Sequence, residues 1–180
     1  MKILLITGPS GAGKDSLLRL AHCHFRDNNR VRFTKRYITR APDTNEQNFF
    51  LDQTAFAILK ENDFFVSHWQ AHGNCYGISR TEFCDLPQKA LSIVSISREN
   101  VTDFEQRFED VTTLCLTVDS EILRKRLKKR GREDDAAIKK RLQRAALPVT
   151  AQNLLLFDNS EELTISGRQF VNLLDSLIKE

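Results

Sequence analysis

Apolar runs and helical repeats alternate along most of this 180-residue chain. Residues 2–7 form a largely apolar run that ends at a glycine cluster, which is typical of a strand buried on both faces of a parallel sheet. Further apolar runs predict strands at 91–97, 111–118 and 154–157. Apolar residues at helical spacing predict helices at 16–26, 99–108, 120–130, 134–147 and 166–178. This alternation predicts an α/β fold, with a parallel sheet and helices on both faces.

A polar segment from about 33 to 82 interrupts the alternation and contains only short β-like pieces. Asp52 is placed to cap a short helix around residues 55–59, and Ser120 to cap the helix that follows it. Ser79-Arg80-Thr81-Glu82 fits a capping box that begins another helix. We expect an inserted subdomain at 33–82 within one domain.

Charge is concentrated in one part of the chain. Eleven Lys or Arg and three Asp or Glu between residues 124 and 144 give that segment a charge of +8, which leaves −5 elsewhere. Three interpretations remain open at this point: a pair of solvated helices, a nucleic-acid surface, or arginines that hold a small polyanion.

The cysteine pattern and the apolar runs indicate a cytoplasmic protein. Cys23, Cys75, Cys84 and Cys115 include no C-x-x-C pair, and the chain reaches Gly8 too soon for the apolar segment of a signal peptide. No stretch approaches the roughly 20 apolar residues of a membrane span. We expect free thiols and no membrane partner. A metal site formed by His68, His72 and Cys75 is a weaker alternative, because no fourth ligand is evident.

The glycine cluster matches the phosphate-loop pattern G-x-x-x-x-G-K between a predicted strand and a predicted helix. In such a loop, successive backbone N–H groups point at phosphate oxygens, and the lysine reaches the β- and γ-phosphates. The candidate ATP site is therefore Gly8, Pro9, Ser10, Gly11, Ala12, Gly13, Lys14, Asp15 and Ser16.

Asp15 departs from this pattern, which has Ser or Thr after the lysine to hold Mg²⁺. A carboxylate is a good oxygen ligand for Mg²⁺, directly or through water. We hypothesise that Asp15 takes the place of the hydroxyl in the coordination sphere of Mg²⁺; the alternative is that it only caps the helix.

Several segments resemble a known family. The opening GPSGAGKDSLL resembles the guanylate kinase-like kinases, and the acceptor-side segments RYITR (36–40), SHWQAHGNCYG (67–77) and Ser97-Arg98 narrow the resemblance to the ribose 1,5-bisphosphate phosphokinases. The resemblance implies a P-loop kinase with a five-stranded parallel sheet flanked by helices, an acceptor-binding insertion and a helical lid. It also implies a core at about 1–32, 83–128 and 145–180, and a lid at about 129–144. The implied reaction is ATP-dependent phosphorylation of ribose 1,5-bisphosphate.

The resemblance also suggests roles for single residues. It places Arg36, Arg40 and Tyr76 on acceptor phosphates, with Arg98 as a possible grip for a second phosphate. Arg130 and Arg132 are the first candidates for catalytic lid arginines, and Arg141 is the next. A lid explains these arginines better than nucleic-acid binding does, so we expect a small phosphorylated sugar as the substrate and no nucleic-acid partner.

The acceptor itself has alternatives. The guanine-reading glutamate of guanylate kinases falls on Ser67 here, which favours a sugar bisphosphate over a nucleotide. Guanylate kinase or another nucleoside monophosphate kinase remains the main alternative, and a non-catalytic scaffold the lesser one. The sequence gives no prediction of oligomeric state.

Overall fold

The computed structural model describes residues 1–41, 48–71, 73–87, 89–131 and 134–179. The helices and strands in these ranges are β1 (Lys2–Thr7), α1 (Lys14–His24), β2 (Val31–Phe33), β3 (Arg36–Ile38), β4 (Phe49–Phe50), α2 (Gln53–Glu61), β5 (Phe65–Ala71), β6 (Asn74–Ser79), β7 (Leu91–Ser95), α3 (Val101–Glu105), β8 (Val111–Thr117), α4 (Ser120–Arg130), α5 (Asp135–Ala145), β9 (Leu154–Asp158) and α6 (Leu163–Lys179).

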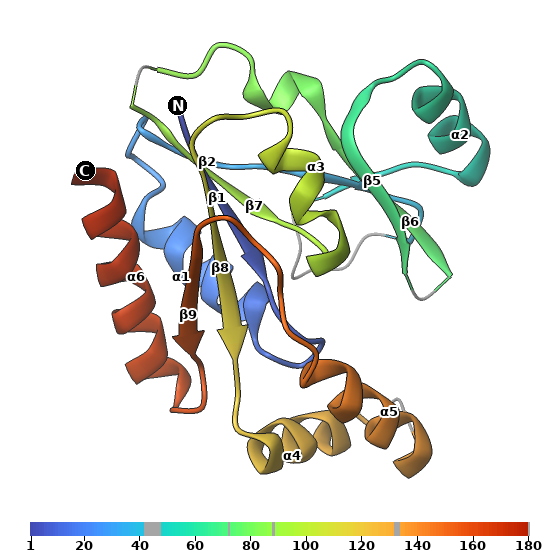
Figure 1. Ribbon diagram of the computed structural model, residues 1–180, viewed down its shortest axis with the longest axis vertical. Helices are drawn as coiled ribbons and strands as arrows, with labels where there is room; N and C mark the ends of the chain where they lie inside the picture. The colour runs from blue at the N-terminus through green and yellow to red at the C-terminus, as the bar shows by residue number, and fades with distance from the viewer. Residues whose placement is uncertain (42–47, 72, 88, 132–133, 180) are drawn as a thin grey trace.

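Within the described residues, the main sheet has five parallel strands in the order β2-β7-β1-β8-β9. Helices α1 and α6 cover one face, and α3 lies on the other (Figure 1). Strand β1 explains its own apolar run: Leu4 and Ile6 pack against the α1 and α6 side, whereas Ile3 and Leu5 pack against the α3 side. The predicted α/β architecture is therefore confirmed.

A second sheet in the order β4-β3-β6-β5 lies beside the main sheet, at the upper right of Figure 1. Strand β6 pairs antiparallel with both β3 and β5. One face carries aromatic rings, with Tyr37, Phe56 and Phe65 among them, and packs against α2. The opposite face carries Ile78 into the hydrophobic core beneath α3. The second sheet is thereby held against the carboxyl end of β7.

Most of the predicted helix starts are confirmed, and two are wrong. Asp52 and Asp134 cap α2 and α5. Asp119, not Ser120, caps α4, because the Asp119 carboxylate accepts hydrogen bonds from the next turn. The expected capping box at 79–82 gives only a short 3₁₀ turn, since the Glu82 carboxylate accepts the Lys35 N–H instead. The helix predicted at 99–108 is also shorter, because a 3₁₀ turn occupies 98–100 and α3 ends at Glu105.

The cysteines are free thiols, as expected. Among the helices in the described ranges, no segment is long and apolar enough to cross a membrane. His72 lies outside the described residues, and elsewhere in those ranges no cluster of three or more His, Cys, Asp or Glu side chains could hold a metal ion.

Candidate active site

The loop between β1 and α1 forms a phosphate cradle at the carboxyl end of the sheet. Helix α1 begins at Lys14, directly after the left-handed residue Gly13, and no side chain caps its first turn. The first N–H groups of a helix have no acceptor within the helix, and the helix dipole makes this end positive. The cradle therefore presents backbone donors to an anion, as the loop pattern predicts.

Two glycines of this loop are required by close packing. At Gly8, with φ of 141°, an added Cβ would lie 2.7 Å from the carbonyl oxygen of Leu116 on β8. At Gly13, with φ of 88°, an added Cβ would lie 2.5 Å from Nδ2 of Asn159, which follows β9. A side chain at either position would meet both strain and a clash. The loop is thus fixed against the ends of two neighbouring strands.

Lys14 carries the positive charge of the loop. Its Nζ donates to the carbonyl oxygens of Gly8, at 2.8 Å, and Pro9, at 3.2 Å. Burial lowers the pKa of Lys14 from 10.5 to about 8; the charges of Arg36 and Arg98 lower it further, and Asp15 opposes them. Both predicted acceptor arginines therefore act electrostatically on the phosphate-loop lysine.

The affinity for ATP should fall as the pH rises through about 8. Above the Lys14 pKa of about 8 the amine of the free protein loses its charge, so it no longer attracts phosphate. We expect the KM for ATP to rise by up to about tenfold per pH unit between pH 8.5 and 9.5. Initial rates at fixed free Mg²⁺ measure this. A KM that stays flat from pH 7 to 9.5 would contradict the role given to Lys14.

Arg36 bridges the two sheets. Its Nε donates to Asn48 Oδ1 at 3.3 Å, and its Nη1 lies 3.5 Å from Ser95 Oγ at the end of β7. Ile38 pairs with Tyr76, so Arg36, Ile38 and Tyr76 share one face of the second sheet. The structure thus brings Arg36 and Tyr76 to the inner face, above the carboxyl end of the main sheet.

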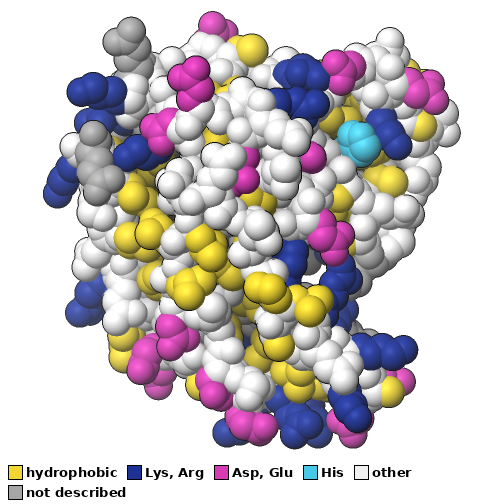
Figure 2. Space-filling model, viewed as in Figure 1, with side chains coloured by type: hydrophobic (Ala, Val, Ile, Leu, Met, Phe, Trp, Pro, Cys, Tyr) yellow, Lys and Arg dark blue, Asp and Glu magenta, His cyan; other side chains and the backbone are white. Residues whose placement is uncertain are grey.

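Arg40 and Tyr76 are both half-buried. Arg40 lies in a bend beyond the end of β3, where Thr39 exchanges two hydrogen bonds with Cys75. The Tyr76 ring stacks on Trp69, with centroids 5.4 Å apart. Figure 2 shows the molecule hollowed between the second sheet and the helices α4 and α5, with Lys and Arg side chains gathered in the hollow. This hollow is suited to a small polyanion.

Arg98 contacts the segment that follows α5. Its Nη1 donates to the Leu147 carbonyl at 2.7 Å, and the neighbouring Glu99 forms an ion pair with Arg144 at 2.6 Å. Arg98 thus stands between Lys14, whose pKa it lowers, and the carboxyl end of the predicted lid. It is not the free helix-surface charge that the sequence left as an alternative.

The other predicted lid arginines differ in what the structure shows of them. Arg141 on α5 donates from Nη1 to Ser10 Oγ at 2.6 Å, so its guanidinium group lies at the phosphate loop. Arg132 lies outside the described residues, and for Arg130 only the backbone, at the end of α4, is described. Arg141 is therefore the lid arginine whose proximity to the nucleotide site the structure describes.

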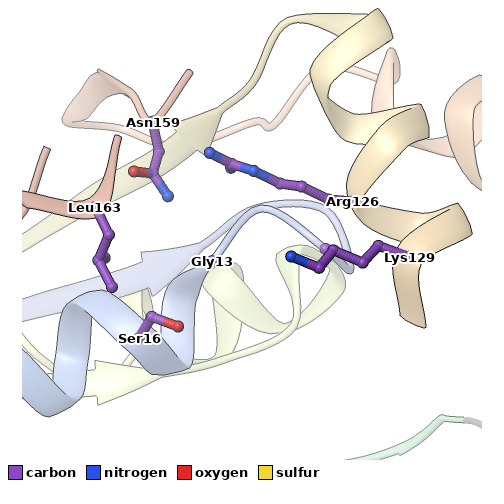
Figure 3. Close-up of a pocket in the computed structure, with 7 residues that line it drawn as sticks. Gly13, Ser16, Arg126, Lys129, Asn159 and Leu163 are labelled. Carbon is purple, nitrogen blue, oxygen red and sulfur yellow. The ribbon is translucent and has the colours of Figure 1, made fainter. Parts of the chain in front are cut away.

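A pocket of about 400 Å³ beside the loop was missed by the sequence analysis. Figure 3 shows its walls, which are formed by Gly11, Gly13, Ser16, Arg126, Lys129, Asn159 and Leu163. Asn159 is 3% exposed, and its Nδ2 donates to the Ala12 carbonyl at 2.6 Å. Its Oδ1 and Arg126 Nη1 are both buried without a hydrogen-bond partner among the described residues. Buried polar atoms of this kind need a partner, and a ligand can supply one.

The donors near the loop fit magnesium bound together with phosphates. Asp15 is exposed in the first turn of α1, close enough for its charge to raise the pKa of Lys14. Mg²⁺ is usually held by one or two carboxylates and the substrate phosphates, not by a cage of protein ligands. A single carboxylate beside a phosphate cradle matches this arrangement.

Comparison with known proteins places the chain among kinases. Two curated relatives are named ribose 1,5-bisphosphate phosphokinase PhnN. The one from Burkholderia mallei is 34% identical over 180 residues, which is 99% of this chain and 97% of that protein. The one from Janthinobacterium sp. is 34% identical over 175 residues, which is 96% of this chain but 39% of that longer protein.

Among solved structures, the guanylate kinase from Anaplasma phagocytophilum matches with a TM-score of 0.69 at 19% identity, covering 99% of this chain and 87% of that one. This likeness shows the fold, which is that of a P-loop kinase. No protein-family model matches the chain.

Proposed function

This chain belongs to the ribose 1,5-bisphosphate phosphokinase family, and from that premise we propose that it transfers the γ-phosphoryl group of ATP to the 1-phosphate of ribose 1,5-bisphosphate. The products are 5-phospho-α-D-ribosyl 1-diphosphate and ADP. The observation that carries the proposal is the position of Lys14 in a glycine loop, facing the cationic hollow that Arg36 and Arg98 enter.

The acceptor end of the site supports this reaction. The acceptor phosphate is already ionised at neutral pH, so the protein needs no general base and has only to align two anions and offset their charge. Arg36, Arg40 and Tyr76 hold the acceptor in this proposal, and Arg98 binds its second phosphate. The Arg98 contact with Leu147 then links acceptor binding to the lid at 129–144.

The nucleotide end of the site includes the pocket beside the loop. We assign it to the adenine base, because it adjoins Gly13 and contains the unpartnered Oδ1 of Asn159. The Asn159 Nδ2 is already used on Ala12, so Oδ1 is left to accept a hydrogen bond from the amino group of adenine. Guanine presents a carbonyl oxygen at that position, so ATP is preferred over GTP.

Replacing Asn159 with alanine should weaken ATP binding much more than turnover. We expect the KM for ATP to rise about tenfold with kcat reduced less than threefold, because a base contact lies far from the reacting phosphate. Steady-state kinetics with ATP and GTP measure this, and the preference for ATP should shrink. Asn172→Ala, at an exposed position on α6, is the matched control. A fall in kcat with unchanged KM would contradict the assignment.

Magnesium is the expected partner of the nucleotide. When bound, it offsets phosphate charge, and Asp15 would hold it directly or through water. Asp15→Ala should raise the Mg²⁺ concentration that gives half-maximal turnover by about tenfold or more. Turnover measured across a Mg²⁺ series at saturating ATP tests this. An unchanged Mg²⁺ dependence would leave Asp15 as a helix-capping residue.

The proposed acceptor is tested by direct competition among acceptors. ADP release should be measured with ribose 1,5-bisphosphate, GMP and AMP at equal concentrations. The proposal predicts at least about a hundredfold preference in kcat/KM for the sugar bisphosphate over either nucleotide, a size that one unmatched set of polar groups produces. A preference for GMP would make the chain a nucleoside monophosphate kinase instead.

A further inference from the structure

A hydrogen-bonded cluster joins the second sheet to α3, outside the residues assigned so far. Ser67 on β5 is 2% exposed, and its hydroxyl donates to Asp103 Oδ2 at 2.5 Å. Asn100 Nδ2 donates to the same oxygen at 2.9 Å and also to the His68 carbonyl at 3.2 Å. Two donors therefore fix the Asp103 carboxylate through one of its two oxygens.

The second oxygen of this carboxylate is available. No described residue donates a hydrogen bond to Asp103 Oδ1, and Asp103 is only half-buried, so a ligand can reach it. An ionised carboxylate accepts hydrogen bonds and donates none. It repels phosphate and attracts neutral donors such as hydroxyl groups.

The sheet register places this carboxylate opposite Arg36. Arg36 on β3 pairs with Ile78 on β6, and Ile78 pairs with Ser67 on β5, so the three residues form one row on the same face. Two strand spacings of about 4.8 Å separate the ends of the row by roughly 10 Å. One end is cationic, and the other carries Asp103 through Ser67. A phosphorylated sugar spans such a row with its phosphate on Arg36 and its hydroxyl edge toward Asp103.

We propose that Asp103 is a specificity-determining residue that accepts a hydrogen bond from a ring hydroxyl of the acceptor sugar, with Ser67 and Asn100 as its positioning residues. This inference rests on the proposed function and names the group that reads the sugar. It also explains why a serine suffices at position 67, since the carboxylate at that place comes from α3. The hydroxyl involved is O2 or O3, because the other ring positions of the bisphosphate carry phosphates or close the ring.

The test compares three proteins on three acceptors. Wild type, Asp103→Ala and Glu105→Ala are each assayed with ribose 1,5-bisphosphate and with its 2-deoxy and 3-deoxy analogues. Glu105 is the matched control, because it is a carboxylate on the same helix that accepts a hydrogen bond from Gln152 N, away from the second sheet. The quantity compared is the ratio of kcat/KM between the ribose compound and each deoxy analogue.

Wild type and Glu105→Ala should prefer ribose 1,5-bisphosphate by about 10- to 100-fold over at least one deoxy analogue, the size of one hydrogen bond to a charged group. In Asp103→Ala that preference should fall below about threefold, while the KM for ATP stays near the wild-type value. An Asp103→Ala protein with the wild-type ratios for both analogues overturns the inference, and so does a wild type that does not discriminate against either analogue.

A folding defect is separated from a specificity effect by thermal unfolding and by a second variant. If Asp103→Ala does not fold, Asp103→Asn keeps the volume and can still accept from Ser67, and its ratio should fall to an intermediate value because the bond loses its charge. Wild-type ratios in that variant overturn the inference. The proposed function fails separately, and visibly, if wild type makes no product from ribose 1,5-bisphosphate. A wild type that prefers GMP, with that preference lost in Asp103→Ala, assigns the carboxylate to a purine edge and also overturns the inference.

Discussion

Replacing Lys14 with methionine should lower kcat/KM for ATP by about 1,000-fold, the loss expected when a buried group that stabilises transferred charge is removed. Methionine keeps an apolar stem of similar length, so the loop glycines and the packing behind them are retained. The charge that the Gly8 and Pro9 carbonyls hold at the loop is lost. Initial-rate kinetics measure the effect.

Lys125 is the control for this substitution, because it is exposed on α4 and no predicted site includes it. Lys125→Met should stay within about twofold of wild type, as is usual for surface changes. Circular dichroism and thermal unfolding should show Lys14→Met folded. A Lys14→Met protein that keeps more than a tenth of wild-type kcat/KM would contradict the phosphate role of the loop.

Arg141→Ala should lower kcat by about 1,000-fold while the KM for ATP changes less than threefold. The Arg141 guanidinium group lies at Ser10 of the loop, where it can stabilise charge on the transferred group. An arginine in that role contributes to the transition state and little to nucleotide binding. Lys140→Ala changes an exposed neighbour on the same helix and should leave both constants near wild type.

The sequence ranks Arg130 and Arg132 ahead of Arg141, so the three alanine variants should be compared in one assay. The variant with the largest loss in kcat identifies the arginine that acts on the transferred group. Equal losses of kcat and of ATP affinity in Arg141→Ala would show that this residue binds nucleotide and does not act on the transition state.

Local chemistry explains what could be predicted from the sequence. The run at 2–7 and the glycines after it define a buried strand and a tight turn through residues that are adjacent in the chain. The same holds for Asp52 and Asp134, whose carboxylates reach the first turn of their own helices. The fold class and the phosphate loop follow from such short-range patterns.

Long-range pairing explains what could not be predicted. Asn159 bonds to Ala12 across 147 positions, so no local pattern marks it as part of the nucleotide site. Glu82 reaches back 47 positions to Lys35, which removes the expected capping box. Asp103 meets Ser67 only because α3 packs beneath β5. In each case tertiary contact decides the role of a side chain whose sequence neighbours suggest nothing unusual.

Arg98 shows the same limit in a residue that was identified from the sequence. The sequence left it between a phosphate ligand and a surface charge, because both fit a residue that follows a strand. Its contact with Leu147, which is 49 positions away, joins it to the segment after α5. That contact gives Arg98 a possible second role in lid closure.

Phosphorus NMR of the product tests the central claim most directly. The protein, with ATP, Mg²⁺ and ribose 1,5-bisphosphate, should convert the single C1 phosphate resonance into two coupled resonances of a diphosphate, while the C5 phosphate remains unchanged and ADP accumulates in equal amount. Stoichiometric ADP with an unaltered C1 phosphate, or no reaction while GMP is converted to GDP, would contradict the account.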